Sequence, residues 1–94
     1  MTRRGMMKLG MSMRGLGYHP AAWRHPEVPA DGTLRFEHYA HNAQTAERGL
    51  FDMIFFADNM GVREANMEAL SRSAQYIANF EPITLIAALA AVTE

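Results

Sequence analysis

The sequence predicts an α/β fold made of two consecutive strand–helix units with parallel strands. The first observation is the run of residues 50–57 (LFDMIFFA), which is apolar without alternation from Met53 to Ala57 and turns polar at Asp58. Such a run is typical of a strand buried on both faces, as in a parallel sheet covered by helices. The second observation is the order of patterns along the chain, which is strand, long loop, helix, strand, loop, helix. This order favours a parallel sheet with helical crossovers.

The first strand is predicted over residues 7–13, where methionine and leucine recur at every second position. Residues 14–33 follow as a long connection rich in glycine and proline. Connections of about 20 residues without a regular element are uncommon in compact domains and are either functional or disordered. The segment contains Tyr18, His19, Trp23 and His25, which favours a functional loop.

The first helix is predicted over Leu34–Arg48, with a stripe of small and aromatic residues suited to packing on a sheet. Asp31 or Thr33 could cap its start, and Gly49 stands where a C-terminal cap glycine is expected. Residues 59–80 are mostly polar, with a possible short helix over residues 64–72.

The second helix is predicted over residues 83–92, which are rich in alanine and leucine. Glu81 and Pro82 open it, because proline is tolerated at the first helical position, where its missing N–H has no partner to lose. This helix is apolar nearly all round, so we expect it to be packed.

The composition is that of an ordinary globular protein, with 49% hydrophobic residues, 20% charged residues and a formal net charge of −1. It indicates neither a nucleic-acid-binding surface nor an acidic tail. The chain has no cysteine, which excludes disulfides and thiolate chemistry. The basic start lacks the apolar stretch of a signal peptide, and the apolar run at residues 83–92 is shorter than the roughly 20 residues of a membrane span. We expect a soluble, cytoplasmic protein without membrane or nucleic-acid partners.

Asp58 is the leading site candidate, because a carboxylate at the C-terminal tip of a parallel strand lies where α/β proteins bind their ligands. The alternative is an aspartate that forms a turn after the strand. His38 and His41 stand three residues apart on the predicted helix, so they share a face and could meet one metal ion. A zinc site needs at least a third ligand, and the spacing matches no zinc motif. We therefore expect an exposed helix face and no metal site.

Residues 17–26, which read GYHPAAWRHP, resemble the stretch after the first strand in flavin-dependent monooxygenases of the bacterial luciferase-like superfamily. The similarity is greatest to the branch of nitrilotriacetate, EDTA and dibenzothiophene-sulfone monooxygenases. Further matching motifs follow in order: residues 46–52 (AERGLFD), residues 55–58 (FFAD), and residues 80–82 (FEP) before an alanine-rich helix. The resemblance covers residues 7–94.

The resemblance implies a TIM-type (β/α)8 barrel, of which this chain would be the first two βα units, truncated before the third strand. Residues 1–94 would then be the N-terminal part of a single luciferase-like monooxygenase domain. The implied activity is that of a two-component enzyme that uses reduced FMN (FMNH2) and O2 to oxygenate a small polar or organosulfur substrate. A separate flavin reductase would supply the FMNH2, and the full-length protein would be a homo-oligomer.

The resemblance also assigns roles to residues. Asp58 would contact the FMN at the end of the second strand. From their chemistry, Trp23 and Arg24 could line the flavin or substrate pocket, and His19 could hydrogen-bond the flavin or help to shape the substrate pocket. The indole can pack against a flat ring, and the guanidinium can bind carboxylate or sulfonyl oxygens. The alternatives are that Trp23 plugs the barrel mouth, that Arg24 is solvated, and that backbone groups satisfy His19. The resemblance does not identify catalytic residues in this chain.

The predicted second helix ends near Glu94, where a third strand is expected. A complete barrel takes about 250 residues, so we expect the chain to be a piece of a larger protein and inactive alone. The competing hypothesis is a catalytically inactive truncated fragment, or an interaction module that a partner stabilises.

Overall fold

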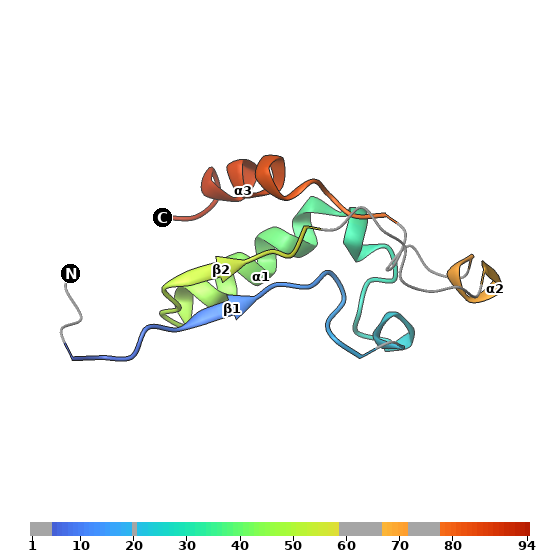
Figure 1. The fold of residues 1–94 in the computed structure, drawn as a ribbon, viewed down its shortest axis with the longest axis horizontal. Helices are drawn as coiled ribbons and strands as arrows, with labels where there is room; N and C mark the ends of the chain where they lie inside the picture. The colour runs from blue at the N-terminus through green and yellow to red at the C-terminus, as the bar shows by residue number, and fades with distance from the viewer. Residues whose placement is uncertain (1–4, 20, 59–66, 72–77) are drawn as a thin grey trace.

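The computed structural model describes residues 5–19, 21–58, 67–71 and 78–94. Within these residues the predicted order of strands and helices is confirmed (Figure 1). The elements are β1 (Gly10–Ser12), α1 (Phe36–Arg48), β2 (Met53–Phe55), α2 (Met67–Leu70) and α3 (Pro82–Ala90), with 3-10 turns at Ala22–Arg24 and Gly32–Leu34.

The two strands form a parallel sheet, as predicted, with Met11 opposite Ile54. The first strand is shorter than predicted, although backbone pairing extends beyond it: Met13 N–H donates to the carbonyl of Phe55 over 2.9 Å. At the other end, Asp52 N–H donates to the carbonyl of Leu9 over 2.8 Å, and the Asp52 carboxylate accepts from Leu9 N–H over 2.8 Å. Asp52 therefore holds the beginning of the second strand in register with the first.

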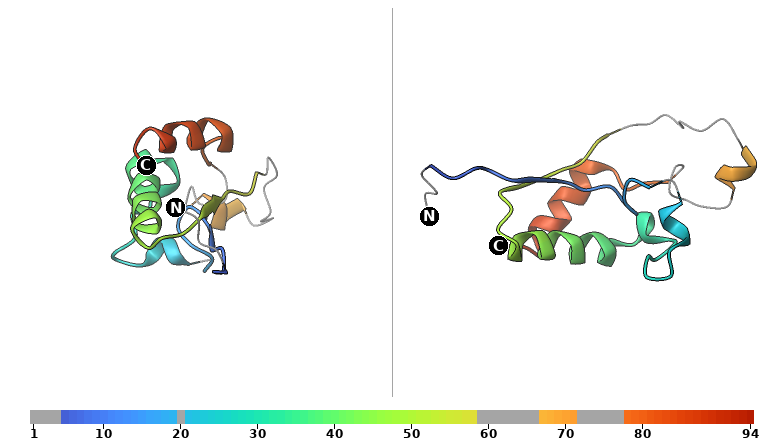
Figure 2. Two further views of the ribbon diagram at one scale, coloured as in Figure 1. Left: turned by 90° about the vertical axis from the view of Figure 1, so that its left-hand side faces the viewer. Right: turned by 90° about the horizontal axis from the view of Figure 1, so that it is seen from below.

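Only one face of the sheet is covered by the described part of the chain. Met11 and Ile54 pack against the hydrophobic core, whereas Met53 and Phe55 on the opposite face are 58% and 54% exposed. The prediction of a strand buried on both faces is therefore wrong for these residues. The physical reason is that α1 and α3 both lie to one side of the strands (Figure 2).

The core joins the sheet to both long helices. It contains Met13 from the end of the first strand, Tyr39 and Ala43 from α1, and Leu85 and Leu89 from α3. The Tyr39 ring lies 6.2 Å from the ring of Phe56 and 5.7 Å from that of Phe80, measured between centroids. Edge and tilted contacts between aromatic rings stabilise the folded state by more than the burial of their apolar area alone.

The predicted stripe of α1 is confirmed, but the helix begins at Phe36 because the residues before it form the 3-10 turn Gly32–Leu34. The predicted N-terminal caps, Asp31 and Thr33, are wrong. Arg35 occupies the N-cap position without a side-chain hydrogen bond. Asp31 instead pairs with Arg35, with 3.7 Å between carboxylate and guanidinium, and Thr33 is buried.

The C-terminus of α1 is a Schellman motif in which Gly49 is the C-cap residue, as predicted, and the next residue is left-handed. Gly49 has a φ of −78°, whereas Leu50 has a φ of 62°. Phe51 N–H donates to the Ala46 carbonyl over 3.1 Å, and Leu50 N–H donates to the Glu47 carbonyl over 3.0 Å. These two bonds satisfy carbonyl groups that the helix end leaves free.

The start of α3 at Pro82 is confirmed, and Glu81 caps it. The Glu81 carboxylate accepts from Ile83 N–H over 3.0 Å and from Thr84 N–H over 2.8 Å, and these bonds lower its pKa. Only Leu85 and Leu89 of this helix are buried, so it packs along one side. The outer side carries Ile83, which is 77% exposed.

Helix α2 falls within the predicted range 64–72, of which residues 64–66 and 72 lie outside the described residues. Among the helices described, none has the length and apolar character needed to cross a membrane.

Candidate functional site

The loop after β1 is a chain of tight turns, and it includes the 3-10 turn Ala22–Arg24 where no regular element was predicted. Gly17 N–H donates to the Arg14 carbonyl over 2.9 Å, and Ala22 N–H donates to the His19 carbonyl over 3.0 Å. Gly17 has a φ of 98°, which side-chain-bearing residues rarely adopt. The 3-10 turn Ala22–Arg24 then carries the two central candidate residues, Trp23 and Arg24.

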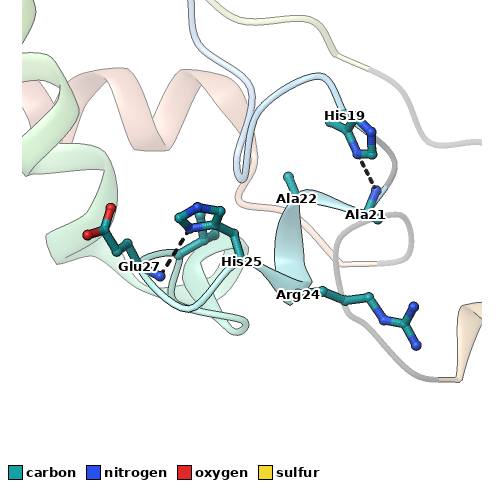
Figure 3. A pocket seen from close by; sticks show the side chains of 7 residues that line it. His19, Ala21, Ala22, Arg24, His25 and Glu27 are labelled. Atoms are coloured by element: carbon teal, nitrogen blue, oxygen red, sulfur yellow. Dashed lines mark hydrogen bonds between the residues drawn. The ribbon is translucent and has the colours of Figure 1, made fainter.

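These turns border an open surface hollow of about 810 Å³ (Figure 3). Its lining is His19, Ala21, Ala22, Arg24, His25, Glu27 and Val28. Of the three predicted substrate residues, the structure thus brings His19 and Arg24 together. Trp23 does not line the hollow, but the guanidinium carbon of Arg24 lies 5.3 Å from the centroid of its ring, within the range of a cation–π contact.

Two imidazoles of this hollow are held in the same way. His19 Nδ1 accepts from Ala21 N–H over 3.0 Å, and His25 Nδ1 accepts from Glu27 N–H over 3.2 Å (Figure 3). A backbone group therefore does satisfy one nitrogen of His19, as the alternative prediction had it. His25 was not among the predicted site residues. In both histidines the ring Nδ1 accepts from the backbone N–H two residues later, and this shared arrangement is visible only in the folded loop.

A second group missed by the prediction ties the loop to the end of β1. The hydroxyl groups of Ser12 and Tyr18 are hydrogen-bonded to each other, and the guanidinium carbon of Arg14 lies 5.3 Å from the centroid of the Tyr18 ring. Ser12 stands opposite Phe55 in the register of the sheet. Tyr18 therefore anchors the loop beside the carboxyl end of the strand.

Asp58 is exposed and lies three residues beyond the last residue of β2. Because the strands are parallel, the loop after β1 and the segment carrying Asp58 leave the sheet at the same end (Figure 1). Asp58 is not among the residues that line the hollow around His25. The structure therefore places Asp58 at the expected end of the sheet, separate from the loop hollow.

His38 and His41 share a second hollow of about 460 Å³, beside Asn42, Arg35 and the loop residues 27–29. The imidazole of His38 is engaged, because its Nε2 hydrogen-bonds the carbonyl of Gly15. In the part of the chain that the structure describes, no group of three or more histidine, aspartate or glutamate side chains is placed to hold a metal ion.

Comparisons with known proteins connect this architecture to a family. No protein-family model matches the chain. A pristinamycin IIA synthase chain of Streptomyces pristinaespiralis is 51% identical over 80 residues, which is 85% of this chain and 19% of that protein. N-acetyl-S-(2-succino)cysteine monooxygenase of Bacillus subtilis is 39% identical over 93 residues, 98% of this chain and 20% of that protein.

Nitrilotriacetate monooxygenase component A of Aminobacter aminovorans is 35% identical over 94 residues, 94% of this chain and 21% of that protein. The chain thus spans about a fifth of the length of these relatives. The matches cover most of the chain, and relatives with monooxygenase names belong to the branch that the motifs indicated. The chain belongs to the luciferase-like monooxygenase superfamily.

Proposed function

We propose that this chain is part of a two-component monooxygenase that uses FMNH2 and O2 to oxygenate a small polar or organosulfur substrate. The observation that carries the proposal is the similarity, over nearly the whole chain, to relatives named as monooxygenases. Their names describe one sulfur-containing and one polycarboxylate compound, which suggests these two substrate classes. A separate flavin reductase would supply the FMNH2. The relatives give no support to the alternative of a non-catalytic interaction module.

We further propose that residues 1–94 are the first two βα units of a (β/α)8 barrel, as the N-terminal part of a single domain. The parallel pairing of β1 with β2 and the open face around Met53 and Phe55 support this arrangement. In such barrels ligands bind at the carboxyl ends of the strands, where the loop hollow and Asp58 lie.

The described residues fit a flavin. The Asp58 carboxylate is exposed and can accept hydrogen bonds from N–H or hydroxyl groups. Phe55, the last residue of β2, offers an exposed apolar ring near this end of the sheet against which a flat ring could pack. When bound, reduced FMN supplies the two electrons that allow one atom of O2 to enter the substrate while the other leaves as water.

The loop residues would bind and orient the substrate. Arg24 can donate to carboxylate or sulfonyl oxygens while its guanidinium rests on the Trp23 ring, which limits its freedom. His19, held by the Ala21 N–H, would contribute a second donor.

Flavin binding tests this proposal directly, because Trp23 is the single tryptophan and its fluorescence reports on the loop. We expect saturable quenching when oxidised FMN is added, and again with FMNH2 under anaerobic conditions. Asp58→Ala should weaken binding about tenfold or more, because a hydrogen bond to a charged group contributes roughly 1.5–3 kcal/mol. Asp31→Ala, which removes another exposed carboxylate, is the matched control and should bind like the parent chain.

Equal FMN affinity of the parent chain and Asp58→Ala would contradict the role of Asp58. Absence of saturable quenching at any FMN concentration, together with stability that rises with protein concentration, would favour the interaction module instead.

A further inference from the structure

We propose that His25 is a substrate-binding residue that donates its Nε2–H to an oxygen of a carboxylate or sulfonyl group. The inference rests on the proposed function, because it takes the hollow after β1 as the substrate site. It adds a residue that the family resemblance did not assign, and it restricts the substrate to compounds with an exposed oxygen acceptor.

The tautomer of His25 follows from its hydrogen bond. A neutral imidazole has one nitrogen that donates and one that accepts. Because His25 Nδ1 accepts from Glu27 N–H over 3.2 Å, the proton of the neutral ring is on Nε2. The same argument puts the proton of neutral His19 on Nε2, since its Nδ1 accepts from Ala21 N–H. Both rings therefore carry an N–H donor on Nε2 that has no hydrogen-bond acceptor among the residues that the structure describes.

The position of His25 is fixed before any ligand binds. Its backbone N–H donates to the Ala22 carbonyl, and its own carbonyl accepts from Val28 N–H, each over 3.0 Å. Pro26, with its restricted φ, stands between the ring and the Glu27 N–H that orients it. A donor held in this way loses little conformational freedom on binding, which favours affinity.

The charges of the hollow favour an oxygen acceptor over a cation. The polar lining consists of two imidazole donors, the guanidinium of Arg24 and the carboxylate of Glu27. Figure 3 shows the side chains of Arg24 and Glu27 pointing to opposite sides of His25. Three of these four polar side chains can donate a hydrogen bond, which favours an oxygen acceptor, and hydrogen bonds to an ionised acceptor are the stronger kind.

The first test measures the tautomer and binding on the unmodified chain, without flavin. Long-range proton–nitrogen NMR spectra of the 15N-labelled chain identify the protonated nitrogen of each histidine. We expect the proton of His25 on Nε2, and a saturable shift of that resonance on adding succinate or methanesulfonate. A proton on Nδ1, or no shift at millimolar concentrations of either anion, would overturn the inference.

Variants then test the donor itself. His25→Phe keeps a ring of similar size and removes the donor, so it should bind succinate about tenfold or more weakly. His41→Phe is the matched control, because His41 is exposed on α1 and does not line this hollow. Preserved NMR dispersion in both variants establishes folding, and unchanged succinate affinity in His25→Phe refutes the proposal.

The two proposals fail separately. Anion binding that depends on His25 without any FMN binding would leave this inference standing and remove the monooxygenase role. FMN binding that depends on Asp58, without any anion binding, would support the monooxygenase role and refute the inference about His25.

Discussion

The left-handed residue at the end of α1 offers a sharp test of the backbone geometry. Leu50 has a φ of 62°, a conformation that costs a side-chain-bearing residue about 1–2 kcal/mol. Leu50→Gly removes this strain, but glycine also gives the unfolded chain more freedom, which costs roughly 0.5–1 kcal/mol relative to alanine. Leu50→Ala is the matched control, because it removes the same 62%-exposed side chain while keeping the strain. Leu50→Gly should therefore be more stable than Leu50→Ala by about 0.75 kcal/mol, the middle of a range of about 0–1.5 kcal/mol.

Urea unfolding followed by circular dichroism measures this difference, and thermal unfolding should show it as about 2–8 °C in Tm. The comparison with alanine cancels the loss of leucine contacts, which the comparison with the parent chain does not. Greater stability of Leu50→Ala would refute the left-handed assignment at this position.

Two further predictions concern the loop and the cap of α3. A methyl group at Gly15 would lie 2.5 Å from Cγ2 of Thr33, so Gly15→Ala should destabilise the chain by about 1–3 kcal/mol in urea unfolding, and adding Thr33→Ser, which deletes Cγ2, should recover part of the loss. If Thr33→Ser recovers none of the lost stability, the contact between the new methyl group and Thr33 is not the cause of the destabilisation. The folded-state pKa of Glu81 is lowered below its usual 4.5, so its stabilisation is present above that pH and is lost as the pH falls through the folded-state pKa. Glu81→Gln should flatten the acid limb of a stability–pH curve, and an unchanged limb would contradict the capping role.

The elements that local chemistry determines were predictable from the sequence. The stripe of α1, the proline at the start of α3 and the apolar run around Ile54 led to the correct order and to a parallel sheet. The predicted boundaries of the helices were less accurate where two local structures compete for the same residues. The turn Gly32–Leu34 forms instead of the first turn of α1, and a leucine takes the left-handed position beside Gly49.

The site was predictable only in part, for a different reason. The residue types of the loop after β1 indicated function, and the parallel sheet put Asp58 at the expected end. The contact between Ser12 and Tyr18 and the orientation of His25 depend on how successive turns fold the loop, which no periodicity in the sequence encodes. Trp23 and Arg24 are adjacent in sequence, yet only the latter lines the hollow, because the 3-10 turn directs the two side chains differently.

The disagreement over β2 is itself informative. A run whose apolar residues do not alternate is typical of a strand with cover on both faces. In the described residues, α1 and α3 cover the face of Ile54 and leave Met53 and Phe55 more than half exposed. Apolar side chains at these two positions contribute to stability only when something else packs on them, at about 25 cal/mol for each Å² removed from water. In the proposed barrel, further parts of the protein would pack on this face, and a bound flavin would cover part of it. The face that stays open in the described residues is therefore the one on which the proposed barrel and the proposed flavin site both depend.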